Sequence, residues 1–411
     1  MTTAPTPTQL DLRSPAIRAN PYPTYARLRQ TAPVAYTHLP TWGHAWLLTR
    51  YEDVANAFKD PRFASDRFNV PDSKADHRFD RWWLPRAFRI FKHLMVAKDA
   101  PTHTRLRNLV HKAFTPRMVE KIRGDMEQVT ERLLDAAEKK GDVNLIEDFA
   151  LPLPVTIISQ LLGVPAEDQN GFHRRIGKFL STNENTLFSL MGQVPNMINL
   201  HRFLLEIIDL RRVKPQEDLL TALVQAEEQG DRLNEDELVS MVFLLLLAGY
   251  ETTVNLIGNG TLALLEHPDQ LQKLREEPGH IGTAIEELLR YGNPSEQPSP
   301  RHAMEDIPLH GQVIPRGSVV VPIIASANRD ETVFKDADRV DITRNPNRHL
   351  SFGLGAHYCV GAPLARMEGQ IAISALVRRF PRMRLAVPLE QLQWSRSLAL
   401  HGLKALPLHL T

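Results

Sequence analysis

The chain has 411 residues, of which 43% are hydrophobic and 24% are charged, proportions that are ordinary for a globular protein. Its 49 basic and 48 acidic residues leave a formal net charge of +1, which argues against nucleic acid as the main partner. The single cysteine excludes an internal disulfide, so the composition does not imply an oxidising compartment.

The N-terminal part predicts a loose start followed by β-structure. Residues 1–12, MTTAPTPTQLDL, are rich in Pro and Thr and predict a flexible arm. They contain neither the basic nor the apolar region of a signal peptide, so we expect a cytoplasmic protein. Residues 34–36 and 45–49 predict short strands, and residues 51–59 predict a helix.

The middle of the chain, residues 102–290, is dominated by helical patterns. Its strongest apolar run, residues 238–250, is too short to span a bilayer and predicts a buried helix. Strand signals return near residue 307, where His310-Gly311 predicts a hairpin turn, and a further helix is expected from about Ala362. No linker or repeat is visible, so we expect one mainly helical domain with smaller β-sheets over residues 1–411.

The most informative segment is FGLGAHYCVGAPLAR, residues 352–366, in which three glycines surround Cys359. Glycines let a backbone adopt positive φ and approach a flat ligand, and a thiolate just before a helix is favoured by the helix dipole. A buried, inert cysteine in a glycine-rich turn is the alternative. A zinc site is set aside, because His357 would need further partners besides one cysteine.

The order Phe-Gly-x-Gly-x-His-x-Cys-x-Gly resembles the haem-binding loop of the cytochrome P-450 family, soluble bacterial type. The resemblance covers residues from about 20 to the C-terminus. It implies the P-450 fold, a triangular helical body with haem b (iron protoporphyrin IX) between a long central helix and the cysteine loop. It further implies that Cys359 is the axial ligand of the iron, and that Phe352 and Gly353 contact the cofactor.

A second motif is AGYETT, residues 248–253, inside a pattern that predicts a helix over residues 236–267, about 48 Å long. Gly249 weakens such a helix by about 1 kcal/mol, which suggests that something flat or bulky approaches there. On the residues alone, Thr252 can bond back to a helix carbonyl and Glu251 can face solvent. The resemblance implies instead that Glu251 and Thr252 relay protons to the reacting oxygen, and that Ala248 and Gly249 contact the haem.

The third motif is Glu287-Leu-Leu-Arg290, a spacing that places both side chains on one helix face. It occurs by chance in many helices, but here it follows the central helix and precedes the cysteine loop. It is similar to the structural ion pair of the family, and Arg339 matches the usual third member. Ala337 and Val340 depart from the Pro and Phe that commonly flank that arginine.

Four basic residues match the positions that anchor the haem propionates in the bacterial branch of the family: His103, Arg107, Arg301 and His357. Histidine and arginine suit carboxylates because they form charge-assisted hydrogen bonds. His103 and Arg107 are one helical turn apart, so they can reach the same site. Any one of them alone would more readily be explained as a solvated surface residue.

The resemblance implies a monooxygenase of secondary metabolism that inserts one atom of O2 into an apolar small molecule by hydroxylation or epoxidation. The alternatives are a peroxygenase that uses H2O2 and a non-catalytic haem sensor. One cysteine cannot hold an iron–sulfur cluster besides the haem, and no Gly-x-Gly-x-x-Gly opens a βαβ unit. We therefore expect a separate ferredoxin or flavodoxin with an NAD(P)H-dependent reductase as partner, no membrane span, and a monomer.

The resemblance also implies which residues line the substrate pocket: Leu244, Leu247, Ala248, Gln297, Pro298 and Leu398. Its roof is expected from residues 66–98 and 172–200. Trp82, Trp83, Phe88 and Phe91 can contact an apolar substrate or can pack that segment against the body. Fatty acids, terpenoids, steroids and macrolides all remain open as substrates.

Overall fold

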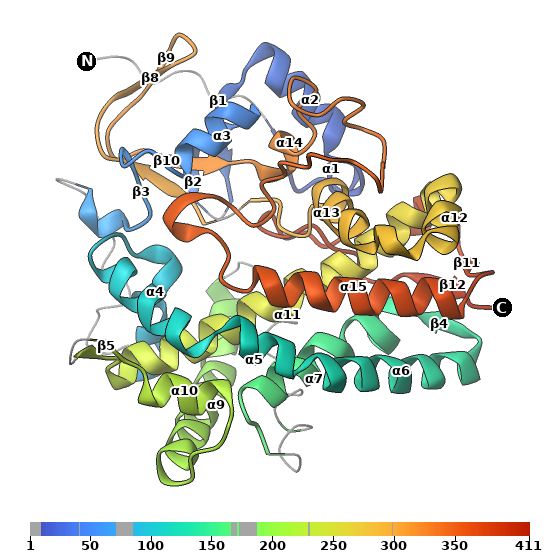
Figure 1. Ribbon diagram of the computed structural model, residues 1–411. Coiled ribbons are helices and arrows are strands. Elements are labelled where there is room, and N and C mark those ends of the chain that lie inside the picture. The colour runs from blue at the N-terminus through green and yellow to red at the C-terminus, as the bar shows by residue number, and fades with distance from the viewer. Residues whose placement is uncertain are drawn as a thin grey trace. The chain divides into compact units, whose positions relative to one another are not determined.

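The computed structural model describes residues 10–40, 42–70, 85–165, 171, 187–228, 231–297 and 299–411 (Figure 1). The chain divides into two compact units. The first unit contains Met1–Ser73, Glu127–Leu153 and Glu251–Thr411, and the second contains Lys74–Met126 and Pro154–Tyr250. The architecture is helical with small sheets, as the sequence predicts.

A five-stranded sheet forms the β-rich part of the first unit. Its order is β1 (Val34–Leu39), β2 (Gly43–Leu48), β10 (Val319–Pro322), β7 (Arg301–Ala303) and β3 (Phe63–Ala64). The β2–β10 pair is parallel, and the other pairs are antiparallel. Alternate residues of β2 enter two different cores, with Trp46 in one and Leu47 in the other. Both faces of this sheet are therefore covered, because successive side chains point to opposite sides.

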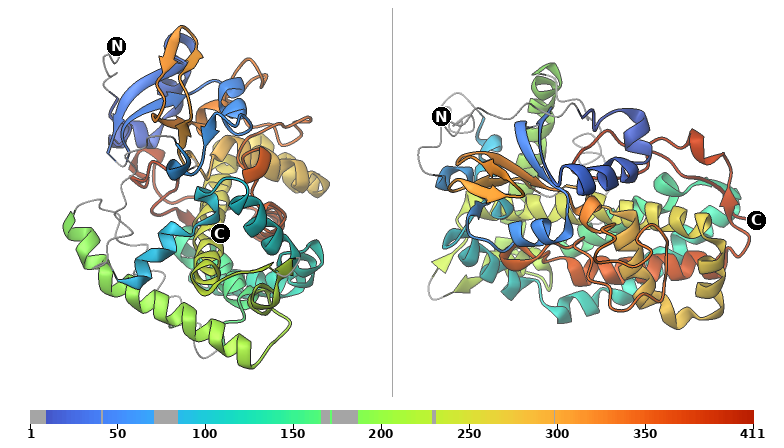
Figure 2. Two further views of the ribbon diagram at one scale, coloured as in Figure 1. Left: turned by 90° about the vertical axis from the view of Figure 1, so that its left-hand side faces the viewer. Right: turned by 90° about the horizontal axis from the view of Figure 1, so that it is seen from above.

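The hairpin of β8 (Ile307–Leu309) and β9 (Gln312–Ile314) lies beside the β1–β2 pair (Figure 2). Its turn residues His310 and Gly311 have φ of +48° and +74°, the left-handed conformation that a two-residue hairpin turn requires. The sequence prediction of a turn at these two residues is confirmed. A third sheet joins β11 (Arg384–Leu385), β12 (Pro407–His409) and β4 (Asp142–Asn144).

Helices supply most of the first unit, together with short 3-10 and π segments labelled η. These elements are α1 (Pro15–Ala19), α2 (Tyr22–Thr31), α3 (Tyr51–Ala57), η1 (Arg67–Asn69), nearly all of α6 (Arg123–Lys140), η5 (Ile146–Ala150), α12 (Pro268–Glu276), η6 (Pro278–His280), α13 (Ile281–Gly292), α14 (Ile324–Ala327), η7 (Gly355–His357), α15 (Ala362–Arg379) and η8 (Leu389–Gln391).

The second unit is almost entirely helical within its described residues. Its elements are η3 (Arg86–Lys92), η4 (Met95–Ala97), α4 (Thr102–Ala113), α5 (Pro116–Lys121), most of α7 (Pro152–Leu161), α9 (Leu187–Val213), α10 (Leu219–Gln225), and the two-stranded β5 (Glu227–Glu228) and β6 (Asp231–Arg232).

The long helix α11 (Glu235–Glu266) begins in the second unit and ends in the first. It matches the helix predicted over residues 236–267 to within one residue at each end. Three acidic residues occupy its first turn, where the helix dipole favours negative charge. By length and composition α11 could cross a membrane, but 67% of its most apolar window is buried inside the protein. The burial is typical of a core helix, which agrees with the sequence interpretation.

Close packing in the first unit fixes α15 against α11 and α13. A Cβ added at Gly369 of α15 would lie 2.9 Å from Leu256 of α11 and 3.3 Å from Ile285 of α13. A larger residue would push the three helices apart, since interiors tolerate little added volume. The start of α15, which follows Cys359 directly, is therefore held by a rigid helical core.

One prediction for the N-terminus is wrong in part. Leu12, at the end of the expected flexible arm, is 3% exposed and packs in a core with Tyr25, Leu28 and Leu47. Burial of an apolar side chain of this size contributes about 2 kcal/mol, enough to hold the last residues of the arm in place. Residues 1–9 lie outside the described part of the chain.

Candidate active site

The cysteine loop has a backbone that favours glycine at two positions. Gly353 and Gly355 have φ of +68° and +69°, in the left-handed region. A Cβ at Gly355 would also lie 2.8 Å from the carbonyl oxygen of Phe58, closer than packed atoms approach. The N–H of Cys359 donates to the carbonyl of Phe352 over 2.8 Å, which closes the loop.

The thiol itself lies beside the start of a helix. Cys359 is exposed, and α15 begins three residues later with Gly361 as its N-cap. A Cβ at Gly361 would lie 3.9 Å from Cys359 Sγ. The positive end of the helix dipole favours a negative charge on the sulfur. Among the described residues no group of three or more His, Cys, Asp or Glu could hold a metal ion.

Phe352 and the N-terminal half of α15 are held together by Arg366. Its guanidinium lies 4.5 Å over the ring of Phe352 and bonds to both carboxylate oxygens of Glu286, at 2.7 and 2.8 Å. Burial raises the pKa of Glu286, but hydrogen bonds from Arg366 and His349 outweigh it and hold the pKa at about 2. Glu286 is therefore ionised at neutral pH, and this ion pair ties α15 to α13 beside the loop.

Two of the four predicted propionate anchors meet in the first unit. Arg301 of β7, 4% exposed, donates through one terminal nitrogen to Ser65 Oγ over 2.7 Å. The same oxygen is 3.0 Å from Nε2 of His357, two residues before the cysteine. Ser65 follows β3, which pairs with β7 through Ala64 and His302. This serine was missed from the sequence, because nothing local distinguishes it from other serines.

The other two predicted anchors lie on α4 in the second unit. His103 is buried, and its N–H donates to the Asp99 carbonyl over 2.9 Å near the start of the helix. Arg107 follows one turn later and donates from Nε to His111 Nε2 over 3.0 Å. Burial and the neighbouring Arg107 lower the pKa of His111, which suits its role as hydrogen-bond acceptor. The two residues are four apart on α4 and therefore lie on one face of that helix.

The predicted acid–alcohol pair lies in the middle of α11. Glu251 and Thr252 are both half-buried, and burial raises the pKa of Glu251. A Cβ added at Gly249, just before them, would come within 4 Å of only one other group, Ile158 Cδ1 at 4.0 Å. Among the described residues, packing would therefore allow a larger side chain at position 249. The space beside Gly249 is compatible with the predicted approach of a cofactor.

A second acid packs against the same helix and was not foreseen from the sequence. Glu368 of α15 is fully buried, and its carboxyl group is hydrogen-bonded to the side chain of Thr253, the residue after the predicted pair. Burial raises the pKa of Glu368 to about 8, against a smaller lowering effect of Thr253. This carboxyl group is therefore mostly protonated at neutral pH.

The Glu287–Arg290 motif is a fully buried ion pair, with two N–O distances of 2.8 Å. The predicted third member, Arg339, is wrong: its side chain is exposed, and only its backbone carbonyl accepts from Arg290, over 2.9 Å. Arg344 occupies that position instead, with its Nε 3.0 Å from Glu287. The carbonyls of Ala337 and Arg339 both face Arg290, so the backbone rather than the side chain of this segment contacts the pair.

The predicted substrate-pocket residues fall into both units. Leu244 and Leu247 on α11 are half-buried and Ala248 is exposed, in the second unit. Gln297 and Leu398, in the first unit, are 3% and 6% exposed. Pro298 lies outside the described residues, as do residues 71–84, which include Trp82 and Trp83, and residues 172–186 of the expected roof.

One aromatic residue of the expected roof packs on the protein itself. Phe91 meets Phe243 of α11 edge-on at 5.8 Å between ring centroids, and Phe88 lies 6.3 Å from Phe91. Edge-to-face pairs of this kind stabilise packing beyond their buried area. This geometry favours the packing alternative for Phe91.

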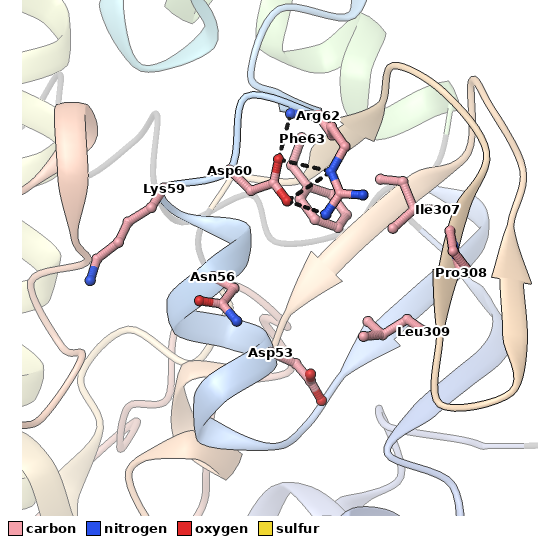
Figure 3. A pocket seen from close by; sticks show the side chains of 9 residues that line it. All are labelled: Asp53, Asn56, Lys59, Asp60, Arg62, Phe63, Ile307, Pro308 and Leu309. Atoms are coloured by element: carbon pink, nitrogen blue, oxygen red, sulfur yellow. Dashed lines mark hydrogen bonds and ion pairs between the residues drawn. The ribbon is translucent and has the colours of Figure 1, made fainter.

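A cavity of about 260 Å³ lies in the first unit between α3, β3 and the β8–β9 hairpin (Figure 3). It is lined by Asp53, Asn56, Lys59, Asp60, Arg62, Phe63, Ile307, Pro308 and Leu309. Asp60 pairs with Arg62 at 2.6 Å, and Oδ2 of Asp53 lies 2.8 Å from Nε2 of His310, so both acids already have partners. Cys359 and the acid–alcohol pair do not line it, and we assign it no part in the chemistry.

The chain is similar to known proteins in both sequence and structure. The family model "Cytochrome P450" matches residues 41–394. The polyketide biosynthesis cytochrome P450 PksS of Bacillus subtilis is 43% identical over 95% of this chain and 96% of its own length. The solved structure of PksS superposes with a TM-score of 0.90 and 41% identity, over 98% of this chain and 100% of that one.

Two further relatives carry names that state a reaction. The 6-deoxyerythronolide B hydroxylase of Saccharopolyspora erythraea is 40% identical over 100% of both chains. The mycinamicin IV hydroxylase/epoxidase of Micromonospora griseorubida is 39% identical over 93% of this chain and 94% of its own.

The chain belongs to the cytochrome P450 family. It is an enzyme of the P450 monooxygenase class, and its cofactor is iron protoporphyrin IX. The described residues fit that group, because the only thiol of the chain sits on a glycine-shaped loop and basic side chains suited to carboxylates lie near it in the first unit.

Proposed function

We propose that this chain is an O2-dependent monooxygenase in which the Cys359 thiolate would bind the haem iron. The observation that carries the proposal is the placement of the only cysteine, exposed on a loop closed onto Phe352 and directly before α15. When bound, the haem supplies the oxidising power that inserts one oxygen atom into a C–H bond or a double bond.

The other proposed haem contacts follow from the residues already described. Arg301 and His357, with His103 and Arg107 of the second unit, bind the two propionate groups through charge-assisted hydrogen bonds. Residues 352–353 and 248–249 would contact the haem, because a Cβ at Gly353 or Gly249 would have no other group closer than 3.8 Å and the missing side chains leave room for a close approach.

Glu251 and Thr252 supply protons to the reacting oxygen in this proposal. Because burial raises the pKa of Glu251, a larger fraction of that carboxyl group is protonated near neutral pH than for an exposed glutamate. A hydroxyl group next to it can receive and pass on a proton without carrying charge. The pair therefore combines a proton source with a neutral relay.

We propose an apolar product of polyketide metabolism as the substrate class. Three relatives at 39–43% identity are named for polyketide biosynthesis or for oxidation of 6-deoxyerythronolide B and mycinamicin IV. Electrons come from a separate ferredoxin or flavodoxin with an NAD(P)H-dependent reductase. In this proposal the enzyme works as a soluble monomer in the cytoplasm.

Optical titration of the haem-loaded protein tests the substrate class. Panels of macrolactones, myristic acid and vitamin D3 are added, and the spin-state shift is followed. The proposal expects the tightest shift with a macrolactone, and product only when NADH, a reductase and a ferredoxin are present. A tighter shift with myristic acid or vitamin D3 than with any macrolactone would reject the substrate class. Turnover with H2O2 that equals the NADH-driven rate would favour a peroxygenase.

A further inference from the structure

Two segments of the first unit that carry predicted pocket residues are joined edge to edge. We call residues 294–297 and 395–402 together the substrate wall, since Gln297 and Leu398 lie in them. The N–H groups of Glu296 and Gln297 both donate to the Ala399 carbonyl, over 2.9 and 3.2 Å. Ser295 forms an antiparallel bridge with Leu400. The two segments therefore move as one unit unless these bonds break.

A single buried arginine from the N-terminal helix α1 ties both segments together. Arg18 is 2% exposed and donates to Glu296 over 2.5 Å. Its other nitrogens donate to the carbonyls of Ser395 and Leu400, each over 3.1 Å. The planar guanidinium thus contacts Glu296 on one segment and two carbonyls on the other, which fixes the angle between them.

The far side of Glu296 is capped as well. Tyr25 of α2 is fully buried and donates its hydroxyl to the second carboxylate oxygen of Glu296. Both partners of the Arg18–Glu296 pair are almost completely shielded from solvent. Desolvation of two charges costs about as much as their attraction returns, so an apolar pair would stabilise the fold equally well. The distinctive effect of this pair is therefore on geometry.

His401 completes the cluster as a neutral acceptor. Burial lowers the pKa of His401 to about 3, with Arg18 and Arg329 acting in the same direction. Its Nδ1 lies 3.2 Å from Arg18, and since the guanidinium can only donate, Nδ1 must accept. The ring stacks on Trp394 at 4.2 Å between centroids. The cluster therefore fixes side chains as well as backbone in the 395–402 segment.

The substrate wall is also bonded to the helix that carries the acid–alcohol pair. Asn259 of α11 donates to the carbonyls of Gly292 and His401, over 2.9 and 2.7 Å. A Cβ at Gly402 would lie 2.1 Å from Oδ1 of Asn255, so the wall backbone rests directly on that amide. Asn255 is one turn after Glu251 on α11. The contact between Gly402 and Asn255 therefore fixes the distance between the substrate wall and the Glu251–Thr252 pair.

We propose that the buried Arg18–Glu296 pair, with Tyr25 and His401, is a positioning device that sets the substrate wall relative to the reacting oxygen and so determines which substrate atom is oxidised. Arg18 is a positioning residue, because it contacts the wall and not the substrate. The inference rests on the proposed function, in which Gln297 and Leu398 line the pocket.

The test compares two buried arginines of the N-terminal helices. Arg18→Met removes the wall contacts, whereas Arg29→Met is a matched control. Arg29 is 4% exposed and bonds to Ser326, Arg329 and Glu331, which lie outside the substrate wall. Each haem-loaded variant is titrated with imidazole, which is small, and with 4-phenylimidazole, whose ring must fit the wall. Amide hydrogen exchange is measured over residues 294–297 and 395–402.

The inference expects Arg18→Met to weaken 4-phenylimidazole binding by about tenfold with imidazole binding unchanged, and to speed exchange of the wall amides. Arg29→Met should leave both the ratio of the two affinities and wall exchange as in the unsubstituted protein. Equal ratios in the Arg18 and Arg29 variants would overturn the inference. If Arg18→Met does not accumulate, Arg18→Lys and Tyr25→Phe replace it, and an unchanged ratio in both refutes the inference.

Failure of the proposed function gives a different pattern. If Cys359 is not the ligand, the unsubstituted protein lacks the thiolate spectrum while the Arg18 effect on wall exchange persists. If the substrate class alone is wrong, macrolactones cause no spin shift but the two azoles still report the wall. Myristic acid, which offers many equivalent C–H positions, then shows whether the ratio of hydroxylated positions differs between the Arg18 and Arg29 variants.

Discussion

Replacement of Glu368 by glutamine tests how burial controls the protonation of this helix core. Glu368 is 2% exposed on α15 and is hydrogen-bonded to the side chain of Thr253. Glutamine keeps the shape and can still hydrogen-bond Thr253, but it cannot ionise. The substitution therefore removes one property, the charge that a buried carboxylate would carry.

The direction in which pH changes the free energy of unfolding follows from the pKa of Glu368. This pKa rises from 4.5 in the unfolded chain to about 8 in the folded protein. The folded state holds the proton more tightly, so this group favours folding fully below pH 4.5 and loses that effect as pH rises through 8. At about 1.36 kcal/mol per pKa unit, the free energy of unfolding of Glu368→Gln relative to the unsubstituted protein rises by about 4 kcal/mol between about pH 5 and pH 9.

Urea unfolding of the haem-loaded protein, followed by far-UV circular dichroism at several pH values, measures this difference. Glu390→Gln is the control, because Glu390 is exposed on η8 and its replacement should leave the pH dependence unchanged. A difference between Glu368→Gln and the unsubstituted protein that stays constant from pH 5 to pH 9 would refute the reasoning. A constant difference is the result expected if Glu368 is already ionised in the folded state at pH 5.

Three further predictions test the relay, the ion pair and the loop. Thr252→Ala should retain haem and substrate binding, but a smaller fraction of the NADH consumed should yield product. An unchanged ratio of product formed to NADH consumed would refute the relay role of Thr252. Arg290→Met should lower the free energy of unfolding by about 3–5 kcal/mol, whereas Arg339→Ala should change it by less than about 0.5 kcal/mol in urea titrations. Gly355→Ala should lose haem incorporation, read from the ratio of haem to protein absorbance, because its Cβ would meet backbone. Gly279→Ala, which has open space around it, should incorporate haem normally.

Features encoded by local residue patterns could be predicted from the sequence. The α11 helix follows from an apolar run flanked by acidic residues, and the β8–β9 turn follows from a His-Gly pair between strand patterns. The cysteine loop could be recognised because its glycines are fixed by backbone conformation and therefore keep a constant spacing from Cys359.

Features that depend on distant segments could not be predicted. Arg344, rather than Arg339, pairs with Glu287, which lies 57 residues before it in the chain, so no local spacing identifies the partner. Ser65 joins Arg301 to His357 across more than two hundred residues of chain. Arg18 and Glu296 are 278 residues apart, so no local spacing marks them as partners.

The most direct test of the central claim is the CO difference spectrum of the dithionite-reduced protein, measured beside Cys359→His. If Cys359 ligates the iron as a thiolate, the unsubstituted protein shows the long-wavelength Soret band that names the family, and the haem-loaded Cys359→His variant lacks it. A short-wavelength band in the unsubstituted protein, or a long-wavelength band that survives in Cys359→His, would contradict the assignment.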